Sequence, residues 1–513
     1  MFKWTTNIKT LGIELWNDLN KTLSRNYTKK ISSMKNVINM WSQREVTMYG
    51  KILLTKTFIL SQFNFLVSCL PSPSEDRIKE IDNMILKFVR SFRSPQKLSK
   101  DIIQLDKFKG GLNLTLLKDQ IIGLKISWVI RLIKNPNLGW KNIVMGALPL
   151  KDQDIWSCNF NKEDGKAIFL HSKNIPYFWK DVIMKWAGYN FYEPKDITDI
   201  LSQTLWFNSY IKNNKREMLF FSSWYSEGLF RVKDLFINNK IASYLEINQK
   251  YPNANINFLK YHGLISMLPQ GWKRIVNVYF SNTLNYMPSI PYNKLDNLLK
   301  CKKTCATVVT QMRENMTAFP SAAFSKWKDN LDLPMDQEQF LNLFQNMYLL
   351  TKDSKLLIFQ YKLLHRNTIT NRNLNLWDQN LEPDLRRSDK CQFCNLATEY
   401  IEHLFYNCQV VKQFWTQIFQ WISTKTNLNI NFTIAEILLG GAPHDLQIFN
   451  LIFLLAKKYI YDCKCLKDKL NIFVFKYRVQ QYFEAEKIIA FDTNKIERFI
   501  SKWDLINECF LTT

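Results

Sequence analysis

The sequence predicts a mainly α-helical protein with more than one domain. Only 14 glycines and 15 prolines occur among 513 residues, which favours long helices joined by few turns. Hydrophobic residues make up 46% of the chain and aromatic residues 14%, so the chain can bury large cores and is not a disordered tail. One core does not extend over such a length, and about two to four domains are expected.

The first segment, residues 1–25, is predicted to hold one β-strand. Its apolar residues Ile8, Leu11, Ile13 and Leu15 alternate roughly with polar ones, as in a half-buried strand. A single strand leaves its backbone hydrogen-bonding groups unpaired. We therefore expect this segment to be the remnant of a larger sheet.

Residues 26–134 are predicted to form a basic, helical domain. Apolar residues recur at spacings of three and four between Ile78 and Phe92, which indicates an amphipathic helix. The acidic start and basic end of this helix suit its dipole and need no ligand. The preceding helix, Met48 to Leu70, ends before Pro71, so the two helices should form an antiparallel hairpin. Gly110-Gly111 lacks the pattern of a phosphate-binding loop and is assigned to backbone geometry.

Residues 135–345 are predicted to form a helical connector region. Large helical domains bury most of their indole rings, so we expect the tryptophans here to be core residues rather than platforms for base stacking. These tryptophans are Trp156, Trp179, Trp186, Trp206 and Trp224. Cys301 and Cys305 have no third metal ligand nearby in the sequence and are expected to be ordinary thiols.

Residues 346–513 are predicted to form a zinc-binding C-terminal domain. Four residues near its middle, Cys391, Cys394, His403 and Cys408, give the spacing C-x2-C-x8-H-x4-C. Two thiolates on a tight turn can hold one side of a tetrahedral Zn²⁺, and the histidine and last cysteine complete the shell. Four protein ligands leave no open position, so this zinc should be structural. The alternative is a set of buried free cysteines beside a surface histidine.

Helices are expected on both sides of this cysteine cluster. Apolar spacing predicts them near residues 356–364, 400–415, 446–467 and 473–490. His365 follows the first of these helices and is expected to be a helix-end or packing residue rather than a fifth ligand.

The charge of the chain indicates a polyanionic partner. Its 69 basic and 45 acidic residues give a formal net charge of +24. Nucleic acid, RNA and/or DNA, is the commonest partner of such a protein. Binding to an anionic membrane surface, or solubility alone, would also account for the charge.

The cysteine pattern and the hydropathy favour an intracellular protein, in the nucleus and/or the cytoplasm. Ten cysteines are spread along the chain, and no apolar leader follows Met1. No membrane span is expected, because the most apolar run, Ile448 to Ala456, is far shorter than the ~20 residues that a span needs.

Several stretches together resemble LINE-type (non-LTR) retrotransposon reverse transcriptases. The likeness to the end of their palm and to their thumb rests on Leu11-Gly12-Ile13, Met48 to Lys56, Leu70-Pro71, Gly110-Gly111-Leu112 and Leu268 to Lys273. The strongest stretch, Lys355 to Trp415, is similar to the zinc-binding C-terminal segment of these polyproteins. The likeness is faint between residues 135 and 250.

The resemblance implies that these parts grip template RNA and target DNA. Polymerisation in this family requires paired carboxylates that hold two metal ions, in an aromatic-x-Asp-Asp hairpin upstream of the Leu-Gly-Ile strand. No Asp-Asp dipeptide occurs in this sequence. We therefore expect a truncated, nucleic-acid-binding C-terminal portion without a polymerase or endonuclease centre, which is not an enzyme on its own. An upstream reverse transcriptase region, or another protein of the element in a ribonucleoprotein, is a candidate partner.

Two alternatives of another class stay open. The chain could be a degenerate retroelement fragment with no biochemical role. It could also be a domesticated, zinc-dependent adaptor protein that binds other proteins through aromatic rather than basic surfaces.

A basic stripe is predicted as the nucleic-acid-binding surface. Residues 1–100 carry 17 Lys or Arg against 7 Asp or Glu, a net charge of +10 and over a third of the total excess. We expect the cations near the ends of the two helices to form one exposed stripe that contacts phosphates: Lys51, Lys56, Arg90, Arg93, Lys97 and Lys100. The alternative is a dispersed, solvated face, since helix ends attract cations in any case.

Overall fold

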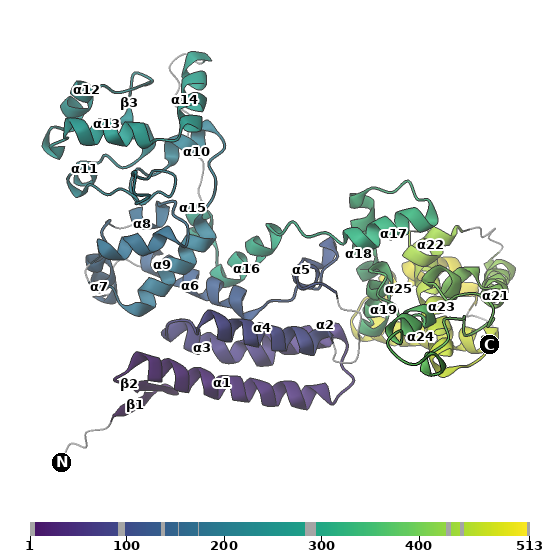
Figure 1. Ribbon diagram of the computed structural model, residues 1–513. Coiled ribbons are helices and arrows are strands. Elements are labelled where there is room, and N and C mark those ends of the chain that lie inside the picture. Colours follow the sequence, from purple (N-terminus) through teal and green to yellow (C-terminus); the bar gives the residue numbers. More distant parts are fainter. Residues whose placement is uncertain are drawn as a thin grey trace. The chain divides into compact units, whose positions relative to one another are not determined.

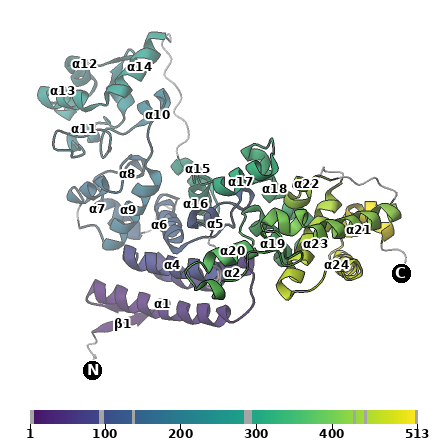
Figure 2. The same ribbon diagram turned by 45° about the vertical axis from the view of Figure 1, so that its right-hand side comes forward.

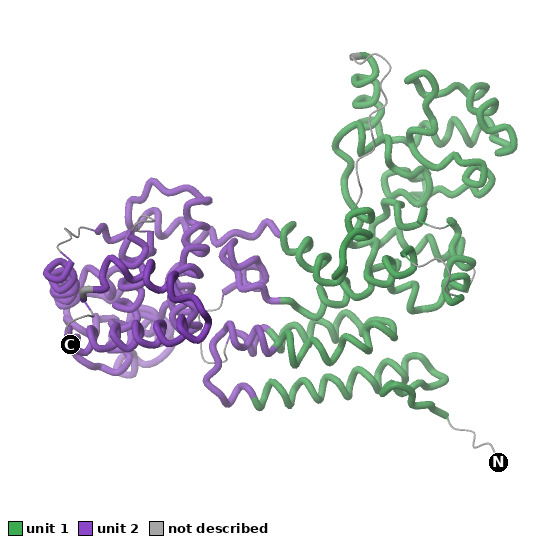
Figure 3. Tube along the Cα trace, turned by 180° about the vertical axis from the view of Figure 1, so that it is seen from behind, with its two compact units in different colours: residues 1–40, 55–85, 115–315 green, residues 41–54, 86–114, 316–513 purple. Residues whose placement is uncertain are grey.

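The chain folds mainly into helices, as the sequence predicts, and Figure 1 shows their arrangement. The computed structural model describes residues 6–90, 98–134, 139–151, 153–172, 174–282, 294–426, 432–441 and 446–509. It divides into two compact units, shown in Figure 3, each made of three stretches of chain. Unit 1 comprises residues 1–40, 55–85 and 115–315, and unit 2 comprises residues 41–54, 86–114 and 316–513. The four-part division proposed from the sequence, with limits at residues 25, 134 and 345, stays a prediction.

Unit 1 contains most of the short helices and the four strands of the described chain. Its regular elements are β1 (Asn7–Thr10), β2 (Ile13–Trp16), α1 (Leu19–Ser42, whose last two residues belong to unit 2), the π-helical turn η1 (Thr55–Leu60), α3 (Ser61–Cys69), most of α4 (Glu75–Arg90), α6 (Leu117–Lys134), α7 (Gly139–Ala147), α8 (Asp154–Ser157), η3 (Asp164–Leu170), α9 (Tyr177–Asn190), α10 (Ile197–Ser202), α11 (Ser222–Ser226), η4 (Val232–Leu235), β3 (Phe236–Ile237), β4 (Lys240–Ile241), α12 (Tyr244–Lys250), η5 (Pro252–Ala254), α13 (Phe258–Met267), α14 (Gln270–Asn282), α15 (Lys294–Lys300) and α16 (Thr304–Glu314).

The start of unit 1 is a β-hairpin, and the prediction of one strand is wrong. β1 and β2 pair antiparallel, with Thr10 opposite Ile13. Leu11 and Gly12 lie between them at φ values of +48° and +82°, the conformation of a tight hairpin turn. The hairpin lies beside the start of α1 in Figures 1 and 2, where the Asn26 side chain donates to the Glu14 carbonyl oxygen at 2.7 Å. The strand therefore finds its partner within the next six residues.

The core of unit 1 is rich in tryptophan, as predicted. Trp156, Trp179, Trp186, Trp206 and Trp224 are all buried. Trp186 donates from its indole nitrogen to the Trp156 carbonyl at 3.1 Å, and Trp206 donates to Leu229 at 2.8 Å. Pairing the buried indole N–H removes the cost of taking it out of water. These rings hold the fold together and are not exposed platforms for stacking.

α6 passes through the middle of unit 1 and carries a buried lysine. The Lys125 ammonium donates to the Leu70 carbonyl at 2.7 Å and lies 3.2 Å from the Asp181 carboxylate. Burial lowers the pKa of Lys125 to about 8, although Asp181 opposes the shift. Asp82, also buried, accepts the N–H of Leu117 at the start of α6, at 2.7 Å. Each buried charge is thus tied to a hydrogen-bonding partner.

One helical stretch is long and apolar enough to cross a membrane. It is Met48–Cys69, formed by α2 (Met48–Leu54), η1 and α3. Of the 18 consecutive residues with the highest mean hydropathy in this stretch, 33% are buried. A helix in the core of a soluble protein passes the same test of length and composition. This finding corrects the expectation that no segment reaches that hydropathy. Lys51 and Lys56 interrupt the apolar residues of this stretch, so it does not stand out as one apolar run in the sequence.

Unit 2 contains the longest helices after α1. Its elements are α2, α5 (Lys100–Gln104), η2 (Lys107–Lys109), α17 (Ser321–Leu331), α18 (Gln337–Leu350), α19 (Ser354–Leu364), α20 (Asn371–Trp377), η6 (Pro383–Leu385), the π-helical turn η7 (His403–Asn407), α21 (Gln409–Thr426), α22 (Ile434–Leu439), α23 (Gln447–Leu466), α24 (Ile472–Asp492), α25 (Ile496–Trp503) and η9 (Asp504–Cys509). The helices predicted on both sides of the cysteine cluster are present.

α19 and α23 form the centre of unit 2 and are buried on most of their surface. Lys457 in α23 is buried, and its ammonium donates to the Leu438 carbonyl at 2.6 Å and to the Gln360 side chain at 2.9 Å. Gln360 donates in turn to the Leu439 carbonyl at 3.1 Å. The carbonyls of Leu438 and Leu439 at the end of α22 therefore accept hydrogen bonds from Lys457 and Gln360. Carbonyls at a helix end have no partner within the helix, and a cation there is also favoured by the helix dipole.

The Gly110-Gly111 turn in unit 2 has a purely structural basis, as predicted. Gly110 adopts a φ of +79°, which glycine tolerates without strain. A Cβ atom on Gly111 would meet the Leu105 carbonyl oxygen at 2.0 Å. The Gly110 carbonyl accepts from the Tyr361 hydroxyl at 3.2 Å and lies 2.8 Å from Nε2 of His365. His365 is thus a buried packing residue at the end of α19, as expected.

Candidate zinc site

The first two predicted ligands lie on a tight turn closed by backbone hydrogen bonds. Cys391 N–H donates to the Ala397 carbonyl at 2.8 Å, and Asn395 N–H donates to the Cys391 carbonyl at 2.9 Å. Asn395 takes a left-handed conformation with φ +56°, which asparagine tolerates better than most residues. This geometry brings the Cys391 and Cys394 side chains to one side of the turn.

The other two ligands begin and end a π-helical turn. His403 is the first residue of η7, and the N–H of Cys408, directly after it, donates to the His403 carbonyl at 3.0 Å. In an α-helix, residues five apart would point about 140° away from each other, since each residue turns by about 100°. A π-helix makes i to i+5 hydrogen bonds and turns by less per residue, so such residues lie closer to one side of the helix. The wider turn of η7 thus accommodates the x4 spacing between His403 and Cys408.

The four side chains converge on one point. All four ligand atoms lie within 4.8 Å of one another. Sγ of Cys391 and Sγ of Cys408 are 3.9 Å apart, and Sγ of Cys394 lies 3.4 Å from Nε2 of His403. Around a tetrahedral zinc with Zn–S bonds of ~2.3 Å and Zn–N bonds of ~2.0 Å, S–S separations of about 3.8 Å and S–N separations of about 3.5 Å are expected. The arrangement fits Zn²⁺, with Nε2 as the nitrogen nearest to the thiols.

The thiols differ in how readily they ionise. Burial raises the pKa of Cys391 to about 12 and also raises the pKa of Cys408. Burial acts in the same direction on Cys394, but the backbone N–H groups of Ala397 and Leu396 and the ring of His403 outweigh it, and its pKa falls to about 6. Cys394 is therefore ready to bind as a thiolate, whereas a metal ion has to displace the protons of the other two.

The buried carboxylate of Glu399 stabilises the turn that carries Cys391 and Cys394. Glu399 is fully buried and accepts the N–H of Gln392 at 3.0 Å and the N–H of Asn371, at the start of α20, at 2.8 Å. Its third partner is a cation from another helix: Nζ of Lys464 in α23 lies 3.0 Å from Oε1. Lys464 also donates to the Ile369 carbonyl at 2.9 Å. Glu399 thus joins the Cys-x2-Cys turn, α20 and α23.

A second ion pair fixes the segment that carries His403. Glu402 accepts from Arg366 at 2.6 Å and from the Asn330 side chain at 2.8 Å. The Arg366 guanidinium lies over the Trp327 ring, 4.3 Å from its centre. Glu399 and Glu402 lie between Cys394 and His403 in the sequence, but the motif itself does not single them out. Acidic residues near a zinc motif give no signal until their partners, far away in the chain, are known.

The comparison with known protein families concerns this same region. Residues 333–415 match the family described as zinc-binding in reverse transcriptase, and the match includes all four ligands. The likeness to reverse transcriptases rests on this segment. None of the curated proteins matches the chain. The family match and the cluster of three cysteines and one histidine together support zinc binding.

The predicted nucleic-acid-binding residues do not form one exposed stripe in the described chain. Lys56 and Lys100 are exposed, but Lys51 is largely buried, with its ammonium 5.4 Å from the centre of the Phe88 ring. Arg90 is half-buried at the end of α4. Lys56 belongs to unit 1, and Lys51, Arg90 and Lys100 belong to unit 2. The expectation of full exposure is wrong for Lys51 because this residue lies on the face of α2 that packs inwards.

Arg93 and Lys97, the other two members of the predicted stripe, lie outside the described residues. Binding of nucleic acid by any of the six stays a prediction.

Proposed function

We propose that this chain is a nucleic-acid-binding part of a LINE-type retrotransposon reverse transcriptase, or of a protein derived from one. The observation that carries the proposal is the match of residues 333–415 to the zinc-binding region of reverse transcriptases, with the four candidate ligand atoms within 4.8 Å of one another. The formal charge of +24 supports a nucleic-acid partner inside the cell, RNA and/or DNA.

In this proposal the zinc has a structural role. Four protein side chains complete a tetrahedral shell, so no position remains for water or a substrate. Cys391, Cys394, His403 and Cys408 would hold the ion, and the ion would join the turn before η7 to the start of α21. Zinc supplies here the cross-link that gives a loop-rich segment a fixed conformation.

Catalysis of polymerisation is not part of the proposal. The sequence contains no Asp-Asp dipeptide, and the two-metal reaction requires paired carboxylates. The chain would serve to hold RNA or DNA while a reverse transcriptase domain acts on it.

Salt-dependent binding tests the proposal. The zinc-loaded chain is titrated with labelled RNA, single-stranded DNA and duplex DNA at several salt concentrations. We expect log K to fall linearly with log salt, by about 0.7 per phosphate contact on single strands and about 0.9 on duplex DNA. Affinity without salt dependence, or no affinity for any of the three, would refute the proposal and favour an adaptor role or a fragment with no role.

A further inference from the structure

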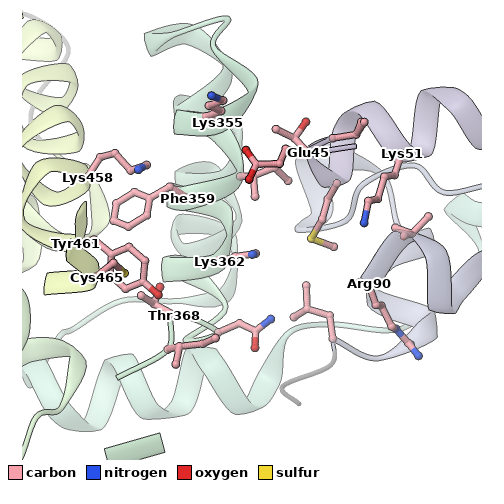
Figure 4. Close-up of a pocket in the computed structure, with 18 of the residues that line it drawn as sticks. Glu45, Lys51, Arg90, Lys355, Phe359, Lys362, Thr368, Lys458, Tyr461 and Cys465 are labelled. Carbon is pink, nitrogen blue, oxygen red and sulfur yellow. The ribbon is translucent and has the colours of Figure 1, made fainter. Parts of the chain in front are cut away.

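A cleft in unit 2 combines cations with apolar side chains. It has a volume of about 600 Å³, and all of its walls belong to unit 2. One wall comes from the start of α2 and the end of α4, and the other from α19, the residues after it, and α23. Figure 4 shows Lys51 and Lys362 on opposite walls, with both side chains directed into the space between the walls. Segments more than 300 residues apart in the sequence thus share one cleft.

The cleft carries more positive than negative charge. Five cations line it, Lys51, Arg90, Lys355, Lys362 and Lys458, against two carboxylates, Glu45 and Asp462. Asp462 is already engaged, because it pairs with Lys458 and lies 3.1 Å from Arg478. In the part of the chain that the structure describes, Lys355 and Lys362 form no ion pair.

Two lysines of the cleft repel each other. Burial lowers the pKa of Lys51, and the nearby positive charge of Lys362 lowers it further. The buried Nε of Arg90 has no hydrogen-bond partner among the described residues. Two like charges held close together repel each other, and an anion between Lys51 and Lys362 would reduce that repulsion.

The size and the remaining lining favour a single-stranded ligand. A cleft of about 600 Å³ has the volume of a pocket for one or two nucleotides, and a duplex does not fit. Met48, Ile358 and Phe359 give it an apolar floor. Sites for single strands combine such surfaces, against which bases pack, with cations for the backbone.

We infer that this cleft binds a one- or two-nucleotide segment of single-stranded nucleic acid, RNA or DNA. Lys51, Lys362 and Lys355 contact its phosphates, and the apolar floor contacts a base. Lys458 contributes less, because Asp462 already neutralises it. This inference rests on the proposed function and assigns it a place in the structure.

Paired charge-removing variants test the inference. Lys51→Gln/Lys362→Gln should weaken binding of a labelled oligouridine by about ten-fold for each lysine and lower the slope of log K against log salt by about 0.7 per phosphate contact. Lys326→Gln/Lys328→Gln is the matched control, since these lysines are exposed on α17, in the same unit and outside the cleft. If the two double variants lost affinity for oligouridine equally, the inference would be overturned while the proposed function would stand. Absence of binding by the unmodified chain would overturn both.

A footprint on the unmodified chain avoids any effect of the variants on folding. Cys465 is exposed and lines the cleft, whereas Cys69 is exposed in unit 1. Saturating oligouridine should slow alkylation of Cys465 by iodoacetamide at least several-fold and leave Cys69 unchanged. A duplex of the same strand length should protect Cys465 much less. Unchanged alkylation of Cys465 at saturation would place the ligand elsewhere and refute the inference.

Discussion

Removing the charge of Lys464 should destabilise the turn that carries Cys391 and Cys394. Lys464→Met would leave the Glu399 carboxylate fully buried without its counter-ion, while the two N–H donors to it remain. Loss of one partner of a buried ion pair costs about 3–5 kcal/mol. Both side chains are at least 94% buried, with exposures of 6% for Lys464 and 0% for Glu399, so solvent screens the pair little.

Hydrogen exchange measures this cost locally, which matters in a chain with two units where one unfolding midpoint is not well defined. A cost of 3–5 kcal/mol should speed exchange of the amides between residues 390 and 408 by about two to three and a half orders of magnitude. Lys469→Met is the control. Lys469 is exposed and lies two residues after Lys467, the residue that caps the C-terminal end of α23.

The double variant Glu399→Gln/Lys464→Met separates pairing from packing. It removes both charges, so most of the lost stability should return, as replacing both members of a buried pair is often neutral. Exchange in Lys464→Met no faster than in Lys469→Met would show that the Glu399–Lys464 pair does not support the turn. A double variant as unstable as the single one would attribute the effect to packing of the lysine stem.

Three further outcomes follow from the site and the fold. Cys408→Ser should lower bound zinc, measured by elemental analysis, from one ion per chain to well below one and speed exchange across the turn before η7; full zinc content would remove Cys408 from the ligand set. Burial lowers the pKa of His365 from 6.5 to about 4, so between these values the unfolded chain binds a proton that the folded chain does not. The free energy of unfolding of unit 2 should therefore be lower by about 3 kcal/mol at pH 4 than above pH 6.5, and denaturant titrations should show that His365→Gln lacks this difference; an equal pH dependence in the two proteins would contradict the assignment. The purified chain should not extend a primer on an RNA template, and extension that is abolished by changing acidic residues of this chain would show a catalytic centre that the proposal denies.

The sequence predicts best where one local pattern determines the structure. The cysteine and histidine spacing predicted the four residues whose side chains converge, because residues three and five apart are brought together by a single turn each. Helical periodicity located α4, and the absence of room for a side chain at Gly111 agrees with its assignment to backbone geometry. Each of these features depends on a few neighbouring residues.

The sequence predicts poorly where the partner lies far away in the chain. Nothing near Glu399 indicates that Lys464, 65 positions later, will neutralise it. The burial of Lys51 depends in the same way on the packing of α2 against α19 in unit 2. The hairpin at the start of unit 1 is hard to predict for another reason: the rough alternation around Leu11 is typical of one strand, although Leu11 and Gly12 form a turn.

The interleaving of the two units sets an order for folding during synthesis. Residues 41–54 and 86–114 belong to unit 2, but the rest of that unit begins only at residue 316. At about 5–20 residues per second, a ribosome needs roughly 10–40 s to make the intervening 200 residues. During that time Met48, Val89 and Ile103 have no core to enter, whereas unit 1 can complete after residue 315. The early segments of unit 2 therefore leave the ribosome well before α19 and α23, the helices at the centre of that unit.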